Sequence, residues 1–144
     1  MSLRELLELP VMLKDIRLGV PTDAVLDSES LRVVGLEIEC GDGIRRFLPL
    51  AAARVREDRL AVGSALLLFE DGVRDFYRRR TSLFSALVGA PVERAGRPLG
   101  TLSDVVVAPD GSAAAVRVAT QGSGDRLHAP AGLVVAAARR ASAA

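Results

Sequence analysis

The chain has 144 residues, which suffices for one ordinary domain or two very small ones. Hydrophobic residues make up 49% of the sequence, and this excludes a disordered chain. The 19 basic and 18 acidic residues leave a net charge of +1, which argues against binding to nucleic acid or to a membrane surface by charge alone. Since aromatic residues are only 3%, we expect a core of aliphatic side chains.

The sequence favours a soluble, cytoplasmic protein. Glu5 and Glu8 stand near the N-terminus, where a secretory signal needs a basic start and an uninterrupted apolar stretch. The richest apolar segment, residues 61–69, is about half as long as the roughly 20 residues that cross a bilayer. Cys40 is the single cysteine, so neither an intramolecular disulfide nor a thiolate metal cluster can form, and we expect no cofactor.

The first half of the chain predicts short strands. Apolar and polar residues alternate over 34–40, which is the period of a half-buried strand. Gly41-Asp42-Gly43 predicts a turn, and a second strand is expected from Ile44 to Leu48. An apolar strand is expected at about 65–69.

The second half predicts the same kind of structure. Residues 116–120 alternate again, after the turn sequence Pro109-Asp110-Gly111. Proline presets φ, Asp bonds the local backbone and Gly accepts a positive φ, so this tripeptide is typical of a tight turn. Short strands closed by turns about every ten residues predict a small barrel or sandwich in each half.

The two halves repeat at an offset of 81 residues, since 100 − 19 = 81. Glycine, aspartate and proline carry the signal, because these residues set backbone conformation. The matching pairs are Gly19 with Gly100, Asp23 with Asp104, and Pro49 with Pro130. We interpret this repeated phrase as a structural motif at a strand entrance, in which Asp bonds nearby backbone amides.

A connector lies between the two copies. Val73, Phe76, Tyr77 and Arg80 fall at helical spacing, so a short helix is expected around 73–80. The stretch Phe76, Tyr77, Arg78, Arg79 and Arg80 is a possible interaction site. Arginine beside aromatic rings suits protein interfaces and single-stranded RNA, and a solvated helix face is the third interpretation.

Residues of the kind that carry chemistry do not form a known catalytic motif. His128 is the only histidine, it falls in a predicted strand, and no G-x-S-x-G sequence accompanies it. One His and one Cys supply no metal-ligand cluster. Glu37 and Glu39 share one strand face, which we expect to be solvated. The sequence therefore predicts no catalytic residues, no cofactor-binding residues and no metal site.

Several short motifs occur in both halves. The second half contains Gly89-Ala90-Pro91-Val92, Leu99-Gly100, Asp104 and Val105-Val106-Val107. The first half contains Leu18-Gly19, Asp23, Arg32-Val33-Val34-Gly35-Leu36 and Phe47-Leu48-Pro49. In these motifs the chain resembles the PRC-barrel family, which includes the cytoplasmic part of the photosynthetic reaction-centre H subunit and the C-terminal domain of a ribosome maturation factor. The resemblance implies a non-catalytic β-barrel that contacts proteins or ribonucleoprotein.

We therefore expect an all-β protein with two small PRC-barrel-like barrels in tandem and a short connecting helix. The expected divisions are residues 1–70 for the first barrel, 71–86 for the connector, 87–138 for the second barrel and 139–144 for a flexible tail. The expected function is a non-catalytic protein-interaction or scaffold module. The alternatives are an RNA- or ribosome-associated factor that uses the Arg-rich connector, and an enzyme of unrecognised type.

The second copy is shorter than the first, because nothing in it matches residues 58–69. A barrel without its last strand exposes an edge and an apolar seam, which natural proteins cover. We expect the second unit to be completed from outside itself, by the 60–69 segment, by the other barrel or by a second chain. A homodimer is the favoured arrangement.

Overall fold

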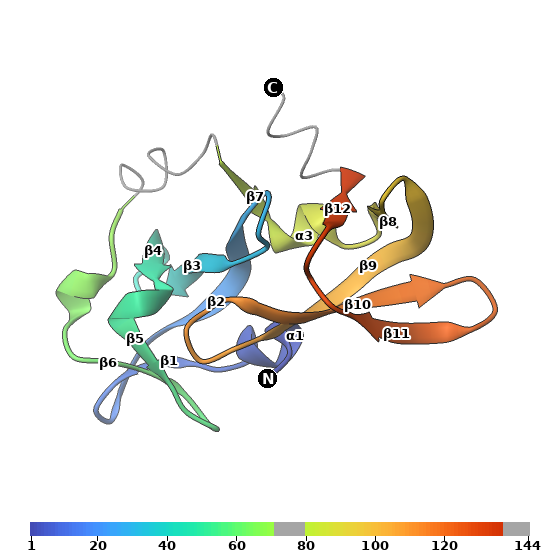
Figure 1. Cartoon of the computed structure of the whole chain (residues 1–144). Helices are drawn as coiled ribbons and strands as arrows, with labels where there is room; N and C mark the ends of the chain where they lie inside the picture. The colour runs from blue at the N-terminus through green and yellow to red at the C-terminus, as the bar shows by residue number, and fades with distance from the viewer. Residues whose placement is uncertain (71–79, 137–144) are drawn as a thin grey trace.

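The computed structural model describes residues 1–70 and 80–136, and strands dominate this part of the chain. The strands form two sheets, one in each half of the sequence, which lie side by side in Figure 1. The protein is thus all-β with two β units, as the sequence predicts. Two one-turn helices, α1 (Leu3–Leu6) and α3 (Phe84–Leu87), lie between the units.

The first sheet has the strand order β4-β3-β2-β1-β6-β5, and β7 pairs separately with β2. Its curled strands form a half-barrel in which only β1 and β6 pair in parallel among the described strands. The long strand β2 is shared, because its first residues pair with β1 and its last residues with β7. The bounds are β1 (Val11–Leu13), β2 (Ile16–Asp27), β3 (Val33–Cys40), β4 (Arg45–Pro49), β5 (Ala53–Val55), β6 (Leu60–Val62) and β7 (Thr81–Leu83).

The second sheet has the strand order β11-β10-β9-β8-β12, and all its neighbours pair antiparallel. Its hairpin β10–β11 projects away from the first unit in Figure 1. The bounds are β8 (Pro91–Arg94), β9 (Arg97–Val107), β10 (Ala113–Thr120), β11 (Gly124–His128) and β12 (Leu133–Val135).

Gly19 and Gly100 occupy like places in the two sheets. Gly19 lies in β2 and Gly100 in β9, and each faces the backbone of the next strand. A Cβ atom at Gly19 would lie 2.5 Å from the carbonyl oxygen of Glu39, and one at Gly100 would lie 2.2 Å from that of Ala119. No real Cβ tolerates such distances, so both positions require glycine. The repeated Leu-Gly pair thus marks where two strands approach closely.

The two units share one hydrophobic core. Buried side chains of both sheets and both helices belong to a single cluster, in which Leu6 of α1 and Leu87 of α3 are 2% and 0% exposed. The turn Pro109-Asp110-Gly111 joins the units at another point, because the Gly111 carbonyl accepts from the Val33 amide at 2.9 Å. The units therefore depend on each other for burial, as small cores do.

Three local expectations are wrong. Residues Ala65–Leu67 form a 3₁₀ helix, η2, instead of an apolar strand, because Ser64 accepts the Leu66 amide and starts a helical turn. Glu37 is buried, at 7% exposure, because β3 is covered on both faces at that position, whereas Glu39 further along the same face is exposed as expected. Segment 60–69 does not complete the second unit, since β6 belongs to the first sheet and β12 pairs with β8.

The expected connector is only partly described. Residues 71–79, which include most of the helix predicted around 73–80, lie outside the described residues, as does the tail 139–144. Residues 81–87 are β7 and α3, and they pack on the first sheet although they begin the second repeat. The other short helix, η1 (Leu50–Ala52), links β4 to β5.

The close approach at the two glycines gives a first prediction. Gly100→Ala and Gly19→Ala should each lower the free energy of unfolding by about 1–3 kcal/mol, because the added methyl group meets a backbone carbonyl that cannot move aside. Urea unfolding followed by circular dichroism measures this change. Gly41→Ala is the control, since nothing lies within 4 Å of its Cβ position, and it should shift stability by less than about 0.5 kcal/mol. Equal effects at all three positions would contradict the claim that Gly19 and Gly100 lie where two strands approach closely.

Candidate functional site

The two aspartates of the repeat are buried, at 8% exposure for Asp23 and 6% for Asp104. Each accepts a hydrogen bond from the backbone amide of the next residue, Ala24 at 2.9 Å and Val105 at 2.8 Å. This local bond is the role expected from the sequence.

Each aspartate also accepts a bond from the other repeat. The Oδ1 atom of Asp104 accepts the amide of Arg4 at 3.3 Å, and that of Asp23 accepts the amide of Ser85 at 3.1 Å. Arg4 and Ser85 are the second residues of α1 and α3, and they are themselves separated by the repeat offset, since 85 − 4 = 81. First-turn amides have no partner within a helix. Asp23, in the first half of the chain, therefore caps α3 of the second half, and Asp104, in the second half, caps α1 of the first half.

Strand pairing follows the same exchange. β7, which precedes α3, pairs with β2 of the first sheet, with Leu83 opposite Val25. At the equivalent place Ser2, which precedes α1, pairs with Val106 of β9. The first sheet thus receives the strand β7 and packs against α3 from the second half of the chain, whereas the second sheet receives a single β-bridge at Ser2 and packs against α1.

The side chains at this junction differ between the two halves. Ser85 donates its hydroxyl proton to Asp23 Oδ2, whereas Arg4 places Nε 4.0 Å from Asp104 Oδ2 and its guanidinium carbon 5.7 Å from the ring centroid of Phe84. Sequence reasoning missed these partners because Arg4 and Ser85 share no side-chain chemistry. Both contacts use a backbone amide as the donor, and no residue type in the sequence marks such an amide.

The other residues singled out from the sequence do not gather at the junction. Pro49 ends β4, Pro130 lies in the turn before β12, and His128 is the last residue of β11. Cys40 is buried in the core. Within residues 1–70 and 80–136, no group of three or more His, Cys, Asp or Glu side chains is placed to hold a metal ion.

The possible interaction site is described only at its end. Phe76, Tyr77, Arg78 and Arg79 lie outside the described residues, and Arg80 is exposed, with its carbonyl accepting the Ser28 amide at 2.8 Å. Burial would raise the pKa of the neighbouring Asp27, but amide and hydroxyl bonds from Ser30 and Glu29 and the charge of Arg80 outweigh it. The pKa of Asp27 is therefore lowered, and Arg80 helps to hold the β2–β3 turn.

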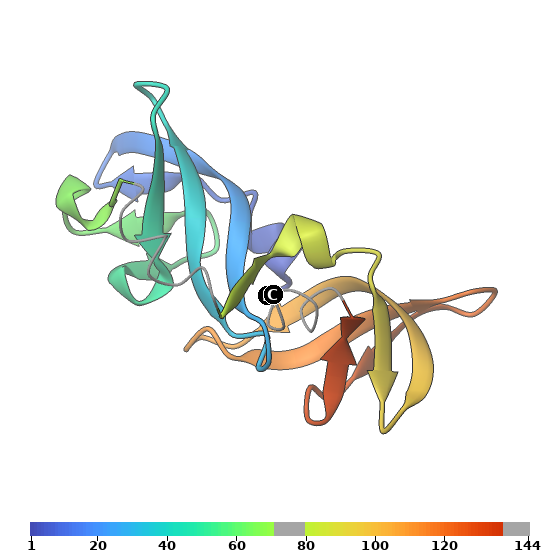
Figure 2. The same ribbon diagram turned by 90° about the horizontal axis from the view of Figure 1, so that it is seen from above.

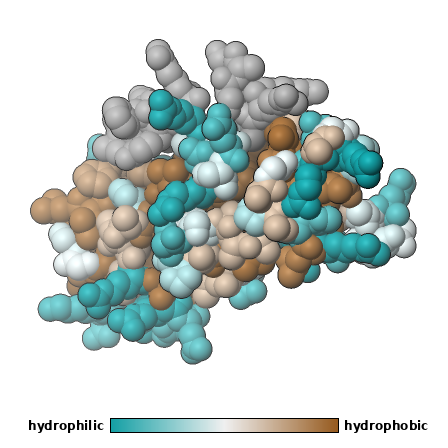
Figure 3. Space-filling view, in the orientation of Figure 1, coloured by the Kyte–Doolittle hydropathy of each residue, from teal (hydrophilic) through white to brown (hydrophobic). Residues whose placement is uncertain are grey.

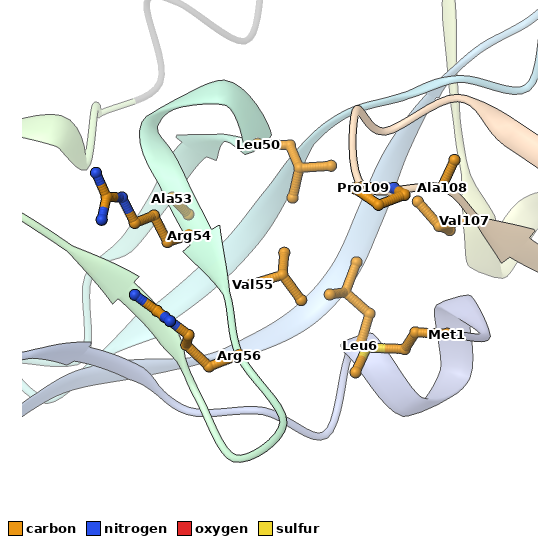
Figure 4. Close-up of a pocket in the computed structure, with 10 residues that line it drawn as sticks. All are labelled: Met1, Leu6, Leu50, Ala53, Arg54, Val55, Arg56, Val107, Ala108 and Pro109. Atoms are coloured by element: carbon orange, nitrogen blue, oxygen red, sulfur yellow. The ribbon is translucent and has the colours of Figure 1, made fainter.

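A groove of about 560 Å³ lies where the two units meet. Its buried floor includes Leu6 of α1 and Leu50 of η1, and Val55 of β5 stands on its wall, 39% exposed. Figure 4 shows Leu6, Leu50 and Val55 pointing into the same space. Met1, Val107, Ala108 and Pro109 line the opposite side.

The strands beside the groove are arranged differently in the two sheets. In the second unit Val135 of β12 is 3% exposed, whereas Val55 of β5 in the first unit is 39% exposed. β12 pairs directly with β8, whereas β6 stands between β5 and β1 in the first sheet. The sequence does not predict the groove. A sequence feature related to the groove is that residues 58–69, which supply β6, have no match in the second half.

The surface beside the groove is mixed. In Figure 3 polar side chains gather along the lower edge of the first unit, and apolar ones lie at the end that carries η2. Leu66 of η2 is 85% exposed, and Ile16 at the start of β2 is 61% exposed.

The search of protein-family models found no match to this chain, and no curated protein matched it. None of the helices within the described ranges is both long and apolar enough to span a membrane.

The reciprocal caps give a second prediction. Asp104→Ala should lower the free energy of unfolding by about 1–2 kcal/mol, because the Arg4 and Val105 amides lose their acceptor. The amides of Leu6 in α1 and of Leu7, its C-cap, should exchange with solvent about tenfold faster, although they lie almost a hundred residues away from Asp104 in sequence.

Native-state hydrogen exchange measures this effect residue by residue. Asp125→Ala is the matched control, because this exposed carboxylate on the same sheet accepts from the Ser103 hydroxyl and touches no helix. It should leave exchange in α1 unchanged. Protection of α1 that survives Asp104→Ala would contradict the exchange of caps.

Proposed function

We propose that this chain is a non-catalytic protein-interaction module of the cytoplasm, and that the groove between its units is the binding surface. The observation that carries the proposal is an apolar groove built by both units, with a buried floor of Leu6 and Leu50 and an exposed Val55. Concave apolar surfaces of this size are where proteins bind partners. A module that joins two small β units around such a groove is suited to scaffolding.

Two further observations support binding over catalysis. The buried carboxylates of Asp23 and Asp104 accept backbone amides, so they are engaged in holding the fold. His128 lies at the end of β11, away from the groove residues. The resemblance to the PRC-barrel family points to the same class of function.

A third prediction tests the proposal. Peptides selected from a random displayed library against the whole chain should bind with micromolar dissociation constants by calorimetry, and about tenfold or more weakly to Val55→Asp, because the added carboxylate would be desolvated in the groove. Ile16→Asp is the control, since Ile16 is more exposed than Val55 and does not line the groove.

The result that would overturn the proposal is a set of peptides that bind Val55→Asp as well as the native chain, or a library that yields no binder. Tight binding of a single-stranded RNA oligonucleotide that weakens steeply with salt would favour the RNA-associated alternative instead.

We also propose that the chain forms a homodimer, and η2 offers a surface for it. Leu66 is 85% exposed and Phe69 is 37% exposed, and exposed apolar groups of this size are common at subunit contacts. Light scattering should give twice the chain mass of 15.2 kDa. Leu66→Asp should reduce the mass to that of one chain, with Ile44→Asp, at 45% exposure on the β3–β4 hairpin, as the control. A native chain that scatters as a monomer would contradict the dimer.

A further inference from the structure

We propose that the groove binds an extended segment of a partner protein, which adds to β5 as a further strand and alternates apolar with acidic residues. This inference rests on the function proposed above, because it names the occupant of the same groove. Three features of the described residues support it: a strand edge, an apolar face and a pair of arginines.

The strand edge belongs to β5. Among the described strands β5 pairs only with β6, with Arg54 opposite Ala61 and Val55 opposite Leu60, so its other side is an edge of the first sheet. Alternate residues of an antiparallel strand direct their N–H and C=O groups away from the partner strand. Such an edge is a template for one more strand, which is how several peptide-binding domains capture extended segments.

The edge strands β4 and β11 are less suited to pairing with an added strand. Phe69 covers β4 at its centre, since it exchanges backbone bonds with Phe47 at 2.6 and 2.8 Å. β11 is an exposed edge, but it carries the mixed charges of Asp125 and Arg126, and its residues do not line the groove. Charges of both signs along an edge discourage pairing. By contrast with these two strands, β5 combines an adjacent apolar groove with an edge that pairs with no described strand, although the Ala53 amide on it donates to the Leu50 carbonyl.

The apolar surface of the groove determines the residue type at every second position of the bound segment. Side chains alternate across a strand, so Val55 and the two arginines beside it take opposite faces of β5. Figure 4 shows Val55 directed toward Leu50, while Arg54 and Arg56, which also line the groove, extend away from Leu6 and Leu50. An added strand would direct alternate side chains toward Val55 and the floor at Leu6 and Leu50. Those positions require apolar residues, because a polar side chain there would be desolvated without a partner.

The charges of Arg54 and Arg56 determine the residue type at the remaining positions of the bound segment. Arg54 and Arg56 are exposed, and neither makes an ion pair with an acidic residue of the described part of the chain. Side chains directly opposite each other on paired strands lie within about 5.5 Å between Cβ atoms, and opposite charges there are favourable. The bound segment should therefore carry Asp or Glu at the positions that lie beside Arg54 and Arg56.

The test uses capped peptides of alternating Val and Glu, and a matched set of alternating Val and Lys, titrated into the whole chain by calorimetry. The Val–Glu peptide should bind about tenfold more tightly at low salt, and the difference should shrink as salt screens the arginines. Methylating alternate backbone nitrogens in one register should weaken binding about tenfold, and methylating those in the other register should not.

The double variant Arg54→Glu/Arg56→Glu should reverse the preference in favour of the Val–Lys peptide. The double variant Arg97→Glu/Arg126→Glu, which changes two exposed arginines of the second unit, should leave it unchanged. Thermal unfolding of both variants verifies that each folds like the native chain.

Two results would overturn the inference. If library-selected peptides bind the groove and are lost in Val55→Asp, but show neither a charge preference nor an effect of backbone methylation, then the strand addition is wrong while the proposed function stands. If the Val–Glu and Val–Lys peptides bind equally, or neither binds, the alternating acidic occupant is wrong.

Discussion

The structure depends on two carboxylates that each hold the other half of the chain. Asp23 and Asp104 accept the second amide of α3 and α1 respectively, and each also fixes the amide of its own neighbour. A buried carboxylate without such donors would be costly, and a helix start without an acceptor would leave amides unpaired. The buried carboxylates and the first-turn amides can pair only when each half of the chain supplies its first segment to the other half. This exchange explains why Leu6 and Leu87 lie together in one core.

The exchange also produces the groove. Because α1 crosses to the second unit, Leu6 and Met1 stand beside β5 of the first unit and the β9–β10 turn of the second. β6 separates β5 from β1 in the first sheet, and Val55 of β5 is exposed, whereas β12 of the second sheet pairs directly with β8 and its Val135 is buried. Two similar aspartate contacts thus hold the halves of the chain together, and the groove is lined by α1 and β5 of the first half and by the β9–β10 turn of the second. We regard this groove as the feature on which the proposed binding function rests.

The sequence predicts the parts of the fold that local chemistry determines. Turn tripeptides and alternating runs identify the strands around 34–40 and 116–120, because these signals act within a few residues. The exchange of segments could not be predicted, since the bond from the Arg4 amide to Asp104 joins residues 100 positions apart and involves no side chain of Arg4. The prediction for Glu37 is wrong for a related reason: strand alternation predicts one solvated face, whereas tertiary packing buries that face at Glu37 and leaves it exposed only at Glu39. The groove depends on where β6 inserts, which no local pattern specifies.

The central claim is that neither unit is complete without the segment supplied by the other. The most direct measurement is to produce residues 1–75 and 76–144 as separate polypeptides and to follow each, alone and mixed, by two-dimensional NMR and light scattering. We predict that each half alone lacks dispersed amide resonances, because it lacks the partner of its buried carboxylate and half of its core, and that an equimolar mixture recovers the spectrum of the intact chain as a one-to-one complex. A dispersed, cooperatively unfolding spectrum from either half alone would contradict the claim.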